Sequence, residues 1–390
     1  MTDIGDGSRP LAPAWTHTGL AQRVHFGAGR LDVLPQVLRE VGARRVLLVT
    51  TERRLASDDG QRLLRLLGRS LAATFDGTRS HVPTTTVQHA LGIARDRDID
   101  GLVSFGGGSC ADLGKAVCFF VEQEAGTPGA SYVDRPVLPH VSIPTTYSGA
   151  ELTPFFGMTD ENTRRKSGAG GPTVAPIAAI YDPVVTLDLP ARVSAETGMN
   201  ALAHGVECAY SPARTPEAEA IALAAIRRIA AALPLVVDDP LDVDARTEML
   251  EGAALAGRCL LNAGVGAHHG LAQLLGGRTG MAHGLANALL LAHVVRFNAD
   301  AVPEEVGRIG DALVTGAASS GLDLSDVGDV AGAIDAFRDR LRLPARLSDA
   351  GVGDDDLEAV ARMAEGSPAV RANPRPVTEA DALRILEAAY

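Results

Sequence analysis

The feature that most constrains the fold is a change in the sequence pattern near residue 188. Before it, short apolar runs alternate with amphipathic helical stretches, which predicts a parallel sheet with helices on both faces. After it, Ala- and Leu-rich helical sequence continues to Tyr390 without a convincing strand. We therefore expect an α/β domain over 1–188 and an all-helical domain over 189–390. The expected strands lie in RRVLLVT (44–50), LAATFDG (71–77), GLVSFGGG (101–108), VLPHVSIPTT (137–146) and AAIYDP (178–183).

Composition and charge restrict the class of protein. Of the 390 residues, 46% are hydrophobic and 22% are charged, which is typical of a folded globular protein. The net charge of −12, without any Lys- and Arg-rich run, argues against a nucleic-acid partner or an anionic membrane surface. The four cysteines form no CxxC pair. With no evident signal peptide or apolar run of about 20 residues, we expect a soluble cytoplasmic protein.

A glycine-rich turn joins the expected strand at 101–106 to a helix that should open near Ser109. Gly106, Gly107 and Gly108 allow backbone amides to approach a pyrophosphate, and the helix N-terminus adds partial positive charge. Ser109 and Asp112, at the start of this helix, are also expected among the cofactor-binding residues. The turn is neither a GxGxxG fingerprint nor a Walker A loop. A tight turn capped by Ser109 and Asp112 is the alternative, and the two interpretations are compatible.

A second polar loop, PTTYSGAE (144–151), suits contacts with the ribose or nicotinamide of a dinucleotide, and a plain Ser/Thr turn is the alternative. Its hydroxyls belong to Thr145, Thr146 and Ser148. We also place Thr50, at the end of the strand expected at 44–50, beside the cofactor. Thr50 and Thr51 cannot repel a 2′-phosphate, and Arg53 and Arg54 could attract one, so NADH or NADPH is expected.

Two segments of the helical half combine His and Asn at spacings that can build one site. In GMNALAHGVE (198–207), Asn200 and His204 project from the same face of a helix. In AHHGLAQLLGGRTGMAHG (267–284), His269 and His283 would lie roughly 21 Å apart on one unbroken helix. Glycines at 276, 277 and 280 turn the chain and bring His283 back. We expect three imidazoles and one carboxamide to converge. His89, His140 and His293 are interpreted as ordinary core or surface residues.

Taken together, these motifs resemble the iron-containing alcohol dehydrogenase family, and within it the maleylacetate reductase branch. The resemblance implies a dehydroquinate-synthase-like fold, with an α/β dinucleotide-binding domain, an all-helical domain and the active site in the cleft between them. It also implies a homodimer built through the N-terminal arm. The motifs cover nearly the whole chain in order: GGGSCADLGK, PTTYSGAELTPFFGMTDENTRRKSG, IYDPVVTLDLP, GMNALAHGVE, HHGLAQLLGG, AHGLANALLLAHVVRFN and NPRPVT.

The resemblance also bears on metal binding. In metal-dependent members an Asp and three His hold a divalent ion, and those places fall here on Asn200, His204, His269 and His283. Three imidazoles and a water can hold zinc, whereas ferrous sites generally want a carboxylate. Asn at this place is similar to what maleylacetate reductases carry, and that branch works without a bound metal. We therefore expect no metal, with the three imidazoles as ligands if one is present.

For this branch the resemblance implies NAD(P)H-dependent reduction of the C=C bond of maleylacetate, or of a related enone acid, to 3-oxoadipate. Hydride would add to the alkene carbon β to the ketone. The three imidazoles, with Asn200 beside them, would stabilise the enolate oxygen, as imidazolium or through another fixed donor, and supply a proton. The alternatives are a zinc- or iron-dependent alcohol or aldehyde dehydrogenase and a specialised non-redox relative.

A small anionic enone or keto-acid substrate needs cationic ligands. Arg165 and Lys166 are the candidates, and a solvated turn is the alternative interpretation. Arg278 lies between the two histidine-bearing helices, and Arg375 is expected to brace the domain end. Gln273 stands where the family usually has His. Because Gln can hydrogen-bond but cannot shuttle a proton, Gln273 predicts a substrate contact and an altered substrate choice.

Overall fold

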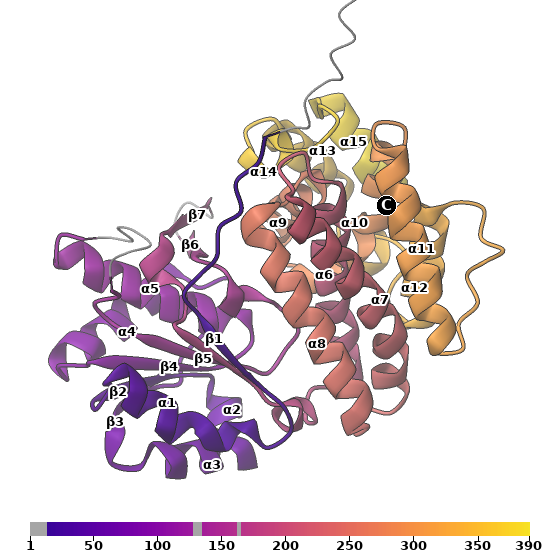
Figure 1. The fold of residues 1–390 in the computed structure, drawn as a ribbon. Coiled ribbons are helices and arrows are strands. Elements are labelled where there is room, and N and C mark those ends of the chain that lie inside the picture. Colours follow the sequence, from indigo (N-terminus) through magenta and orange to yellow (C-terminus); the bar gives the residue numbers. More distant parts are fainter. Residues whose placement is uncertain (1–13, 128–134, 162–164) are drawn as a thin grey trace, which may run out of the picture.

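The computed structural model describes residues 14–127, 135–161 and 165–390, with the backbone alone for 165 and 166. Within these residues the N-terminal half holds a parallel six-stranded sheet in the order β1-β8-β5-β4-β2-β3 (Figure 1). Its strands are β1 (Arg23–Phe26), β2 (Val46–Val49), β3 (Leu71–Phe75), β4 (Gly101–Gly106), β5 (His140–Pro144) and β8 (Ala178–Tyr181). Its helices are α1 (Leu34–Val41), α2 (Glu52–Ala56), α3 (Asp58–Leu67), α4 (Thr84–Asp96) and α5 (Gly108–Glu124).

Helices cover both faces of this sheet, as the alternating sequence pattern predicts. In β2, Val46 and Leu48 pack with α1 and α3 on one face. Leu47 and Val49 pack with α4 and α5 on the other. Successive side chains point to opposite faces of a strand, so a strand covered on both sides must be apolar throughout. All four β2 side chains are fully buried, and the expected α/β arrangement is confirmed.

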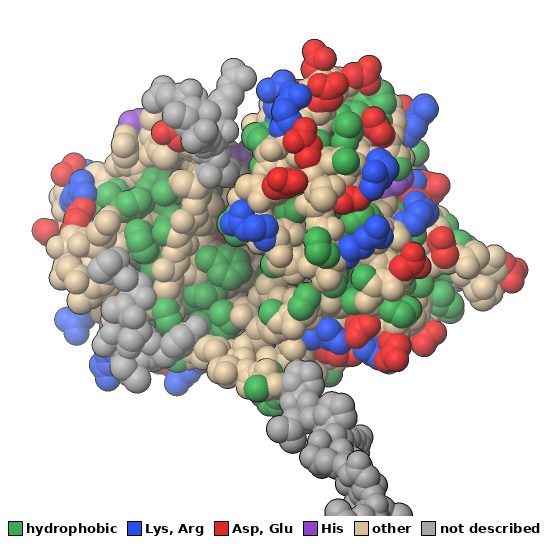
Figure 2. Space-filling view, turned by 90° about the horizontal axis from the view of Figure 1, so that it is seen from above, with side chains coloured by type: hydrophobic (Ala, Val, Ile, Leu, Met, Phe, Trp, Pro, Cys, Tyr) green, Lys and Arg blue, Asp and Glu red, His purple; other side chains and the backbone are tan. Residues whose placement is uncertain are grey.

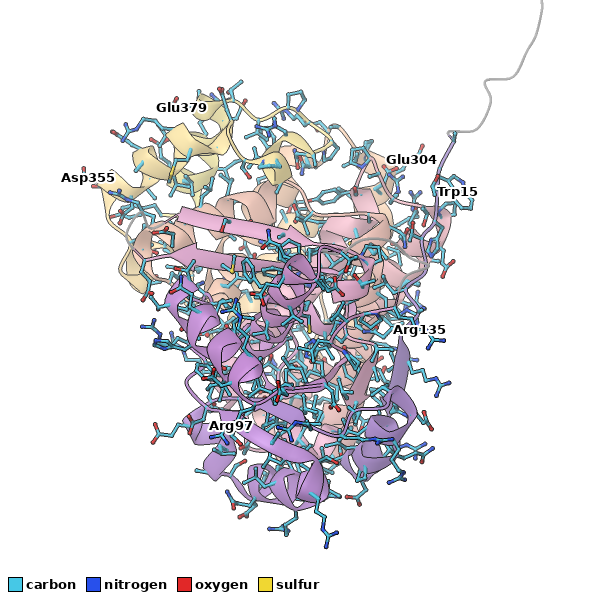
Figure 3. All side chains as sticks on the ribbon, turned by 90° about the vertical axis from the view of Figure 1, so that its left-hand side faces the viewer. Trp15, Arg97, Arg135, Glu304, Asp355 and Glu379 are labelled. Atoms are coloured by element: carbon cyan, nitrogen blue, oxygen red, sulfur yellow. The ribbon has the colours of Figure 1, made fainter. Side chains whose placement is uncertain are left out.

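An antiparallel hairpin stands outside the main sheet and was not expected. Strand β6 (Phe155–Asp160) pairs with β7 (Arg165–Gly170). Figure 3 shows the hairpin on the side of the α/β half that lies nearest the C-terminal helices. Phe156 packs into the same apolar cluster as α4 and α5. Strand β7 contains two glycines in RKSGAG, so it lacks the apolar alternation by which strands are recognised in a sequence.

The C-terminal half is helical, and no strand follows β8 in residues 182–390. Helix α6 runs through its centre, and every residue from Gly198 to Tyr210 is buried. Figure 1 shows α6 to α15 grouped beside the sheet. The helices are α6 (Ala191–Tyr210), α7 (Pro216–Asp238), α8 (Val243–Cys259), α9 (Ala267–Thr279), α10 (His283–Asn298), α11 (Pro303–Ser319), α12 (Val330–Arg340), α13 (Asp354–Ala364), α14 (Pro368–Arg371) and α15 (Glu379–Ala388).

Helix α7 corrects one expectation. It has 23 residues and is long and apolar enough to cross a membrane by length and composition, although no such stretch was expected. In this structure it packs against α6, α8 and α11, and 56% of its most apolar window is buried. Its apolar character is therefore explained by its place in the core, where Ile226, Ile229 and Leu233 are fully buried.

The N-terminal segment links the two halves. Thr18 N–H donates to Asn262 Oδ1 at 2.7 Å, and Asn262 Nδ2 donates to Thr18 O at 2.9 Å. His17 Nδ1 lies 3.0 Å from Thr215 Oγ1. The chain then enters β1, an edge strand that pairs with β8 (Figure 1). Trp15, at the start of the segment, is 59% exposed (Figure 3). Residues 14–20 of the arm thus lie along the helical half, and 1–13 fall outside the described residues.

Candidate active site

The glycine turn lies where β4 ends and α5 begins. Gly106 has φ +154°, and a Cβ there would lie 2.5 Å from Cys110 Sγ. Such backbone favours glycine. Gly107 is the N-cap of α5, and no side chain caps this helix among the described residues. The capping alternative is therefore wrong: Ser109 lies inside the first turn, and Asp112 pairs with Lys115 at 2.8 Å. Cys110 N–H donates to Gly107 O at 2.9 Å, and the amides before Cys110 lie at the helix N-terminus, where an anion is favoured.

The polar loop packs directly on this turn, which brings the two predicted cofactor segments together. A Cβ on Gly107 would lie 3.1 Å from Thr146 Cγ2, and one on Gly108 would lie 3.0 Å from Ser148 Oγ. Thr145 N–H donates to Gly106 O at 2.9 Å. The buried ammonium of Lys115 donates to Ala150 O at 2.7 Å, so α5 also holds the end of the loop. This arrangement suits a dinucleotide whose pyrophosphate faces the glycines.

Thr50 and Arg54 do not have the places expected of them. Thr50 is fully buried, and its hydroxyl donates to Phe105 O at 2.7 Å, so its side chain belongs to the sheet. Arg54 forms an ion pair with Asp188 and donates to Val185 O at 3.0 Å. Its guanidinium lies 4.8 Å from the centre of the Phe105 ring. Because Arg54 is engaged by these partners, only Arg53 of the two arginines is exposed enough to meet a 2′-phosphate.

The predicted imidazole cluster forms between α6, α9 and α10. The ring centres of His204 and His269 are 4.5 Å apart, and those of His269 and His283 are 5.8 Å apart. The convergence of the three rings is therefore observed. Gly280, with φ +76°, ends α9 and allows the chain to turn into α10. Gly276 and Gly277 instead lie inside α9, so one glycine makes the turn that three were expected to make.

Asn200 joins this cluster with its carboxamide already bonded. Asn287 Nδ2 donates to Asn200 Oδ1 at 2.6 Å, and both side chains are buried. His204 Nδ1 and His269 Nε2 are also buried, and neither has a hydrogen-bond partner among the described residues. A buried nitrogen without a hydrogen bond destabilises the folded protein, and such atoms are typical of ligand-binding sites. They mark the space next to the two rings as the place where a substrate or another ligand would bind.

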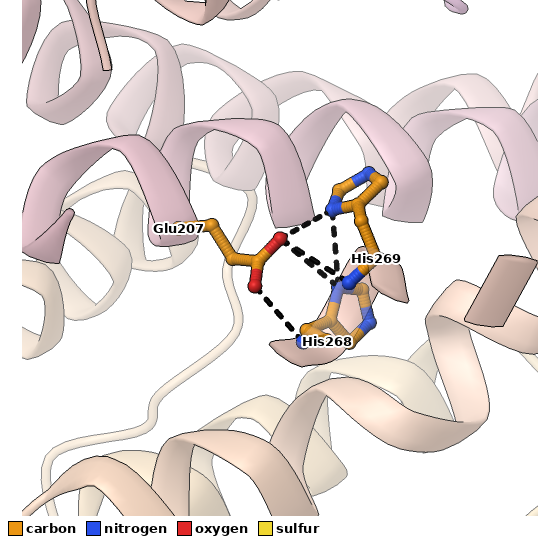
Figure 4. A group of neighbouring side chains, drawn as sticks. All are labelled: Glu207, His268 and His269. Carbon is orange, nitrogen blue, oxygen red and sulfur yellow. Dashed lines mark hydrogen bonds and ion pairs between the residues drawn. The ribbon is translucent and has the colours of Figure 1, made fainter. Parts of the chain in front are cut away.

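Glu207 was not predicted from the sequence, and it is fully buried beside His268 and His269 (Figure 4). Its Oε2 lies 2.6 Å from His269 Nδ1, and its Oε1 accepts the N–H of Gly266 at 3.0 Å and of His268 at 2.9 Å. His268 Nε2 in turn lies 2.8 Å from Asn287 O. The available signal was spacing, because Glu207 follows His204 by three residues and shares its helix face.

Burial sets the charge of these groups. Burial, followed by the neighbouring His269 and His268, holds the pKa of His204 well below its usual range. Burial, followed by His268, does the same to the pKa of His269. Both rings are therefore neutral at neutral pH in the free protein, and an imidazolium is disfavoured before substrate binds. Burial also raises the pKa of Glu207, while His268 and three backbone N–H groups oppose that rise.

The donor atoms do not fit the metal site of the metal-dependent relatives. Asn200 offers no carboxylate, and its oxygen is taken by Asn287. Glu207, His268 and His269 also lie close together, but Glu207 Oε2 and His269 Nδ1 are only 2.6 Å apart. Two ligands of a tetrahedral zinc with bonds of about 2.0–2.1 Å lie roughly 3.3 Å apart. The 2.6 Å distance is that of a hydrogen bond. Glu207, His268 and His269 therefore form a hydrogen-bonded network and not a set of zinc ligands.

The structure describes the side chains of only some of the residues predicted to bind substrate. Strand β7 contains Arg165 and Lys166, but their side chains lie outside the described residues. Gln273 is exposed one helical turn after His269 on α9. Arg278 pairs with Asp356 at 2.8 Å. Arg375 donates to Phe297 O at 3.0 Å and lies over the Phe297 ring, which is the bracing role expected for it.

Comparison with known proteins agrees with this geometry. The chain matches the iron-containing alcohol dehydrogenase description over residues 21–183 and the C-terminal domain of the Fe-containing alcohol dehydrogenase family over 194–390. It is 34% identical over 370 residues to the maleylacetate reductase of Sphingobium indicum, covering 95% of this chain and 96% of that one. It is 40% identical over 291 residues to maleylacetate reductase 2 of Cupriavidus pinatubonensis, covering 75% and 76%.

Solved structures show the same likeness. The crystal structure of maleylacetate reductase from Rhizobium sp. strain MTP-10005 superposes with a TM-score of 0.83 at 32% identity, covering 97% of this chain and 99% of that one. A crystal structure of 1,3-propanediol oxidoreductase superposes with a TM-score of 0.86 at 30% identity, covering 94% and 98%. The chain therefore belongs to the iron-containing alcohol dehydrogenase family, in its maleylacetate reductase branch.

Proposed function

We propose that this protein is an NAD(P)H-dependent reductase that converts maleylacetate to 3-oxoadipate. The observation that carries the proposal is the Asn-and-three-His cluster, with Asn200 bonded to Asn287 where metal-dependent relatives have an Asp. The similarity to maleylacetate reductases over nearly the full chain supports the substrate. In this reaction, maleylacetate, NAD(P)H and one proton give 3-oxoadipate and NAD(P)⁺.

The chemistry needs a hydride donor, a site for a developing oxyanion and a proton. The dinucleotide lies against Gly107 and Gly108 and the loop that contains Thr146 and Ser148, and it supplies the hydride. Hydride adds to the alkene carbon β to the ketone, and negative charge moves to the ketone oxygen. Neutral imidazole N–H groups of the cluster hydrogen-bond this oxygen, and protonation of the neighbouring carbon completes the product. His204 and His283 can supply such an N–H group, and His269 belongs to the same cluster as a ring that accepts or passes on a proton.

The reaction proceeds without a metal in this proposal. Alcohol and aldehyde dehydrogenases of the family place hydride on the carbonyl carbon, where a Lewis acid stabilises a localised alkoxide. An enolate spreads its charge over oxygen and carbon, so fixed hydrogen-bond donors suffice. The missing carboxylate at Asn200 supports this difference. A zinc-dependent dehydrogenase is the second candidate, and the unpartnered nitrogens of His204 and His269 favour it.

The remaining features follow from the same assignment. The substrate partner is a small dianion, and Figure 2 shows Lys and Arg side chains interleaved with Asp and Glu over the helical half of the face in view, which suits no polyanion. A second copy of the chain docks through the N-terminal arm at the outer edge of β1, which is an edge strand and where Val24 is 40% exposed. We place the division between the domains near Asp188 and the enzyme in the cytoplasm.

The deciding experiment measures oxidation of NADH and of NADPH with freshly prepared maleylacetate, using protein stripped of metal and analysed for residual metal. Rapid turnover without metal is the expected result. Turnover that returns only when zinc or iron is added would favour the second candidate. Intact dinucleotide binding without any turnover would direct the search to other enones and ketones, with Gln273 as the leading clue.

A further inference from the structure

Helix α9 begins with every one of its first amides bonded by a side chain from elsewhere. Glu207 accepts the N–H groups of Gly266 and His268 through Oε1, and that of His269 through Oε2 at 3.3 Å. Asn373 Oδ1 accepts the remaining one, from Ala267, at 3.3 Å. The first N–H groups of a helix have no partner within the helix, and local Ser, Thr or Asp side chains usually bind them. Here a carboxylate from α6 does so at the centre of the cluster.

The same carboxylate bonds the ring of His269. Glu207 Oε2 lies 2.6 Å from His269 Nδ1, while His269 Nε2, the nitrogen that Glu207 does not bond, is buried without a partner among the described residues. Burial disfavours the charged form of Glu207, but three backbone N–H groups at the positive end of a helix donate to its two oxygens and oppose that effect. An ionised carboxylate has only acceptor sites. The ring must then provide the proton of the hydrogen bond, which fixes the Nδ1–H tautomer.

We propose that Glu207 is the positioning residue of the reductase, because it holds the His269 proton on Nδ1 and so presents Nε2 to the reacting molecule. Every proton that His269 gives or receives then passes through Nε2, next to His204. This proposal rests on the proposed function for the identity of the reaction, whereas the tautomer is a property of the free protein. Asn373 also caps α9 but makes no hydrogen bond to the His269 ring. A variant of Asn373 therefore tests the effect of capping without the effect of positioning.

The tautomer is measured first, in protein without substrate, by NMR of selectively ¹⁵N-labelled histidine. The chain has ten histidines, and the His269 signals are identified by their loss in His269→Gln. The expected result is a protonated Nδ1 and a bare Nε2. A wild-type His269 with its proton on Nε2 would overturn the proposal, whatever the activity proves to be.

The matched variants are Glu207→Gln and Asn373→Ala. In Glu207→Gln the carboxamide oxygen can still accept backbone N–H groups, but its NH₂ faces His269 Nδ1 and moves the ring proton to Nε2. We expect kcat to fall about 10- to 100-fold with the Kd for NADH unchanged within about twofold. Asn373→Ala, which loses a cap but keeps the ring bond, should lower stability and change kcat by less than about threefold.

Equal losses of kcat in the two variants would show that Glu207 acts only as a helix cap, and the proposal would fail. An unchanged tautomer in Glu207→Gln would also overturn it. Wild-type protein that has the expected tautomer but does not reduce maleylacetate would refute the proposed function alone, which keeps the two failures distinct.

Discussion

Asn200 on α6 and Asn287 on α10 are bonded side chain to side chain at 2.6 Å, and both are buried. The bond joins two of the three helices that form the imidazole cluster. It also occupies the oxygen that would otherwise face a cation. An aspartate at position 200 would accept the same hydrogen bond with one oxygen and keep a second, charged oxygen free.

Asn200→Asp is therefore expected to create a metal site. Wild-type protein incubated with zinc and dialysed should retain well under one equivalent, and the variant should retain about one, because it has three imidazoles and a carboxylate. Metal content measured by mass spectrometry checks this. Asn262→Asp, which adds the same charge at a residue that bonds Thr18 and lies outside the cluster, is the control. Equal metal content in the two variants would contradict the expectation.

Gly107→Val is expected to weaken NADH binding at least tenfold, which is about 1.4 kcal/mol. A Cβ at this position already lies 3.1 Å from Thr146 Cγ2, so a branched side chain displaces the polar loop and fills the space of the pyrophosphate. Titration of NADH fluorescence gives the Kd. Gly92→Ala is the control, since a Cβ there meets nothing within 4 Å. Tight binding to the valine variant would remove the glycine turn from the cofactor site.

His204→Ala is expected to lower kcat about 100-fold or more while leaving the Kd for NADH unchanged, because the imidazole faces the reacting group and not the dinucleotide phosphates. Steady-state kinetics and NADH titration measure the two quantities. His293→Ala removes a half-buried imidazole outside the cluster and should keep both near wild type. A loss of NADH affinity as large as the loss of kcat would refute the role given to His204.

Gln273→His is expected to change the ratio of kcat/KM between maleylacetate and a substituted enone acid by about tenfold. The side chain lies one turn after His269, and a histidine there could exchange protons as glutamine cannot. Gln61→His, at a position on α3 that is also exposed, controls for an added imidazole. An unchanged substrate profile would end the hypothesis that Gln273 sets substrate choice.

His140 makes stability depend on pH. Burial, followed by the charge of Lys115, lowers the pKa of His140 from 6.5 to about 3. Between these two pH values His140 is protonated in the unfolded chain and neutral in the folded protein. The contribution of neutral His140 to the free energy of unfolding is therefore fully present above pH 6.5 and is lost as the pH falls toward 3. From pH 7 to pH 5 this one group contributes a loss of about 2 kcal/mol. The loss appears as a fall in the urea midpoint, and His140→Gln should reduce it.

His89→Gln, which removes an exposed imidazole on α4 and keeps His140, is the control. A wild-type pH dependence in His140→Gln would show that His140 is protonated in the folded protein.

The sequence predicted the parts of the site whose chemistry is local. The glycines of 106–108 must lie at a tight strand–helix turn, and His269 and His283 could meet only if the chain turned between them. What it could not predict depends on distant contacts. Thr50, at a strand end, was expected to contact the cofactor, but its hydroxyl donates to Phe105 O on the neighbouring strand. The spacing of Glu207 from His204 was the only local signal for it, and only the folded position of α9 makes it a cap.

The edge position of β1 has a consequence for how the protein is made. Its partner in the sheet is β8, so Arg23 can pair only after Ala178 has been synthesised. In the same way, Thr18 can bond Asn262 only after that residue has been made. Strand β1 is thus made long before its partner β8 and can pair in the sheet only after β8 is made, although chains generally fold from the N-terminus during synthesis. Until then the growing chain exposes an unfinished sheet edge. The pairing of β1 with β8 therefore completes this side of the sheet late in folding.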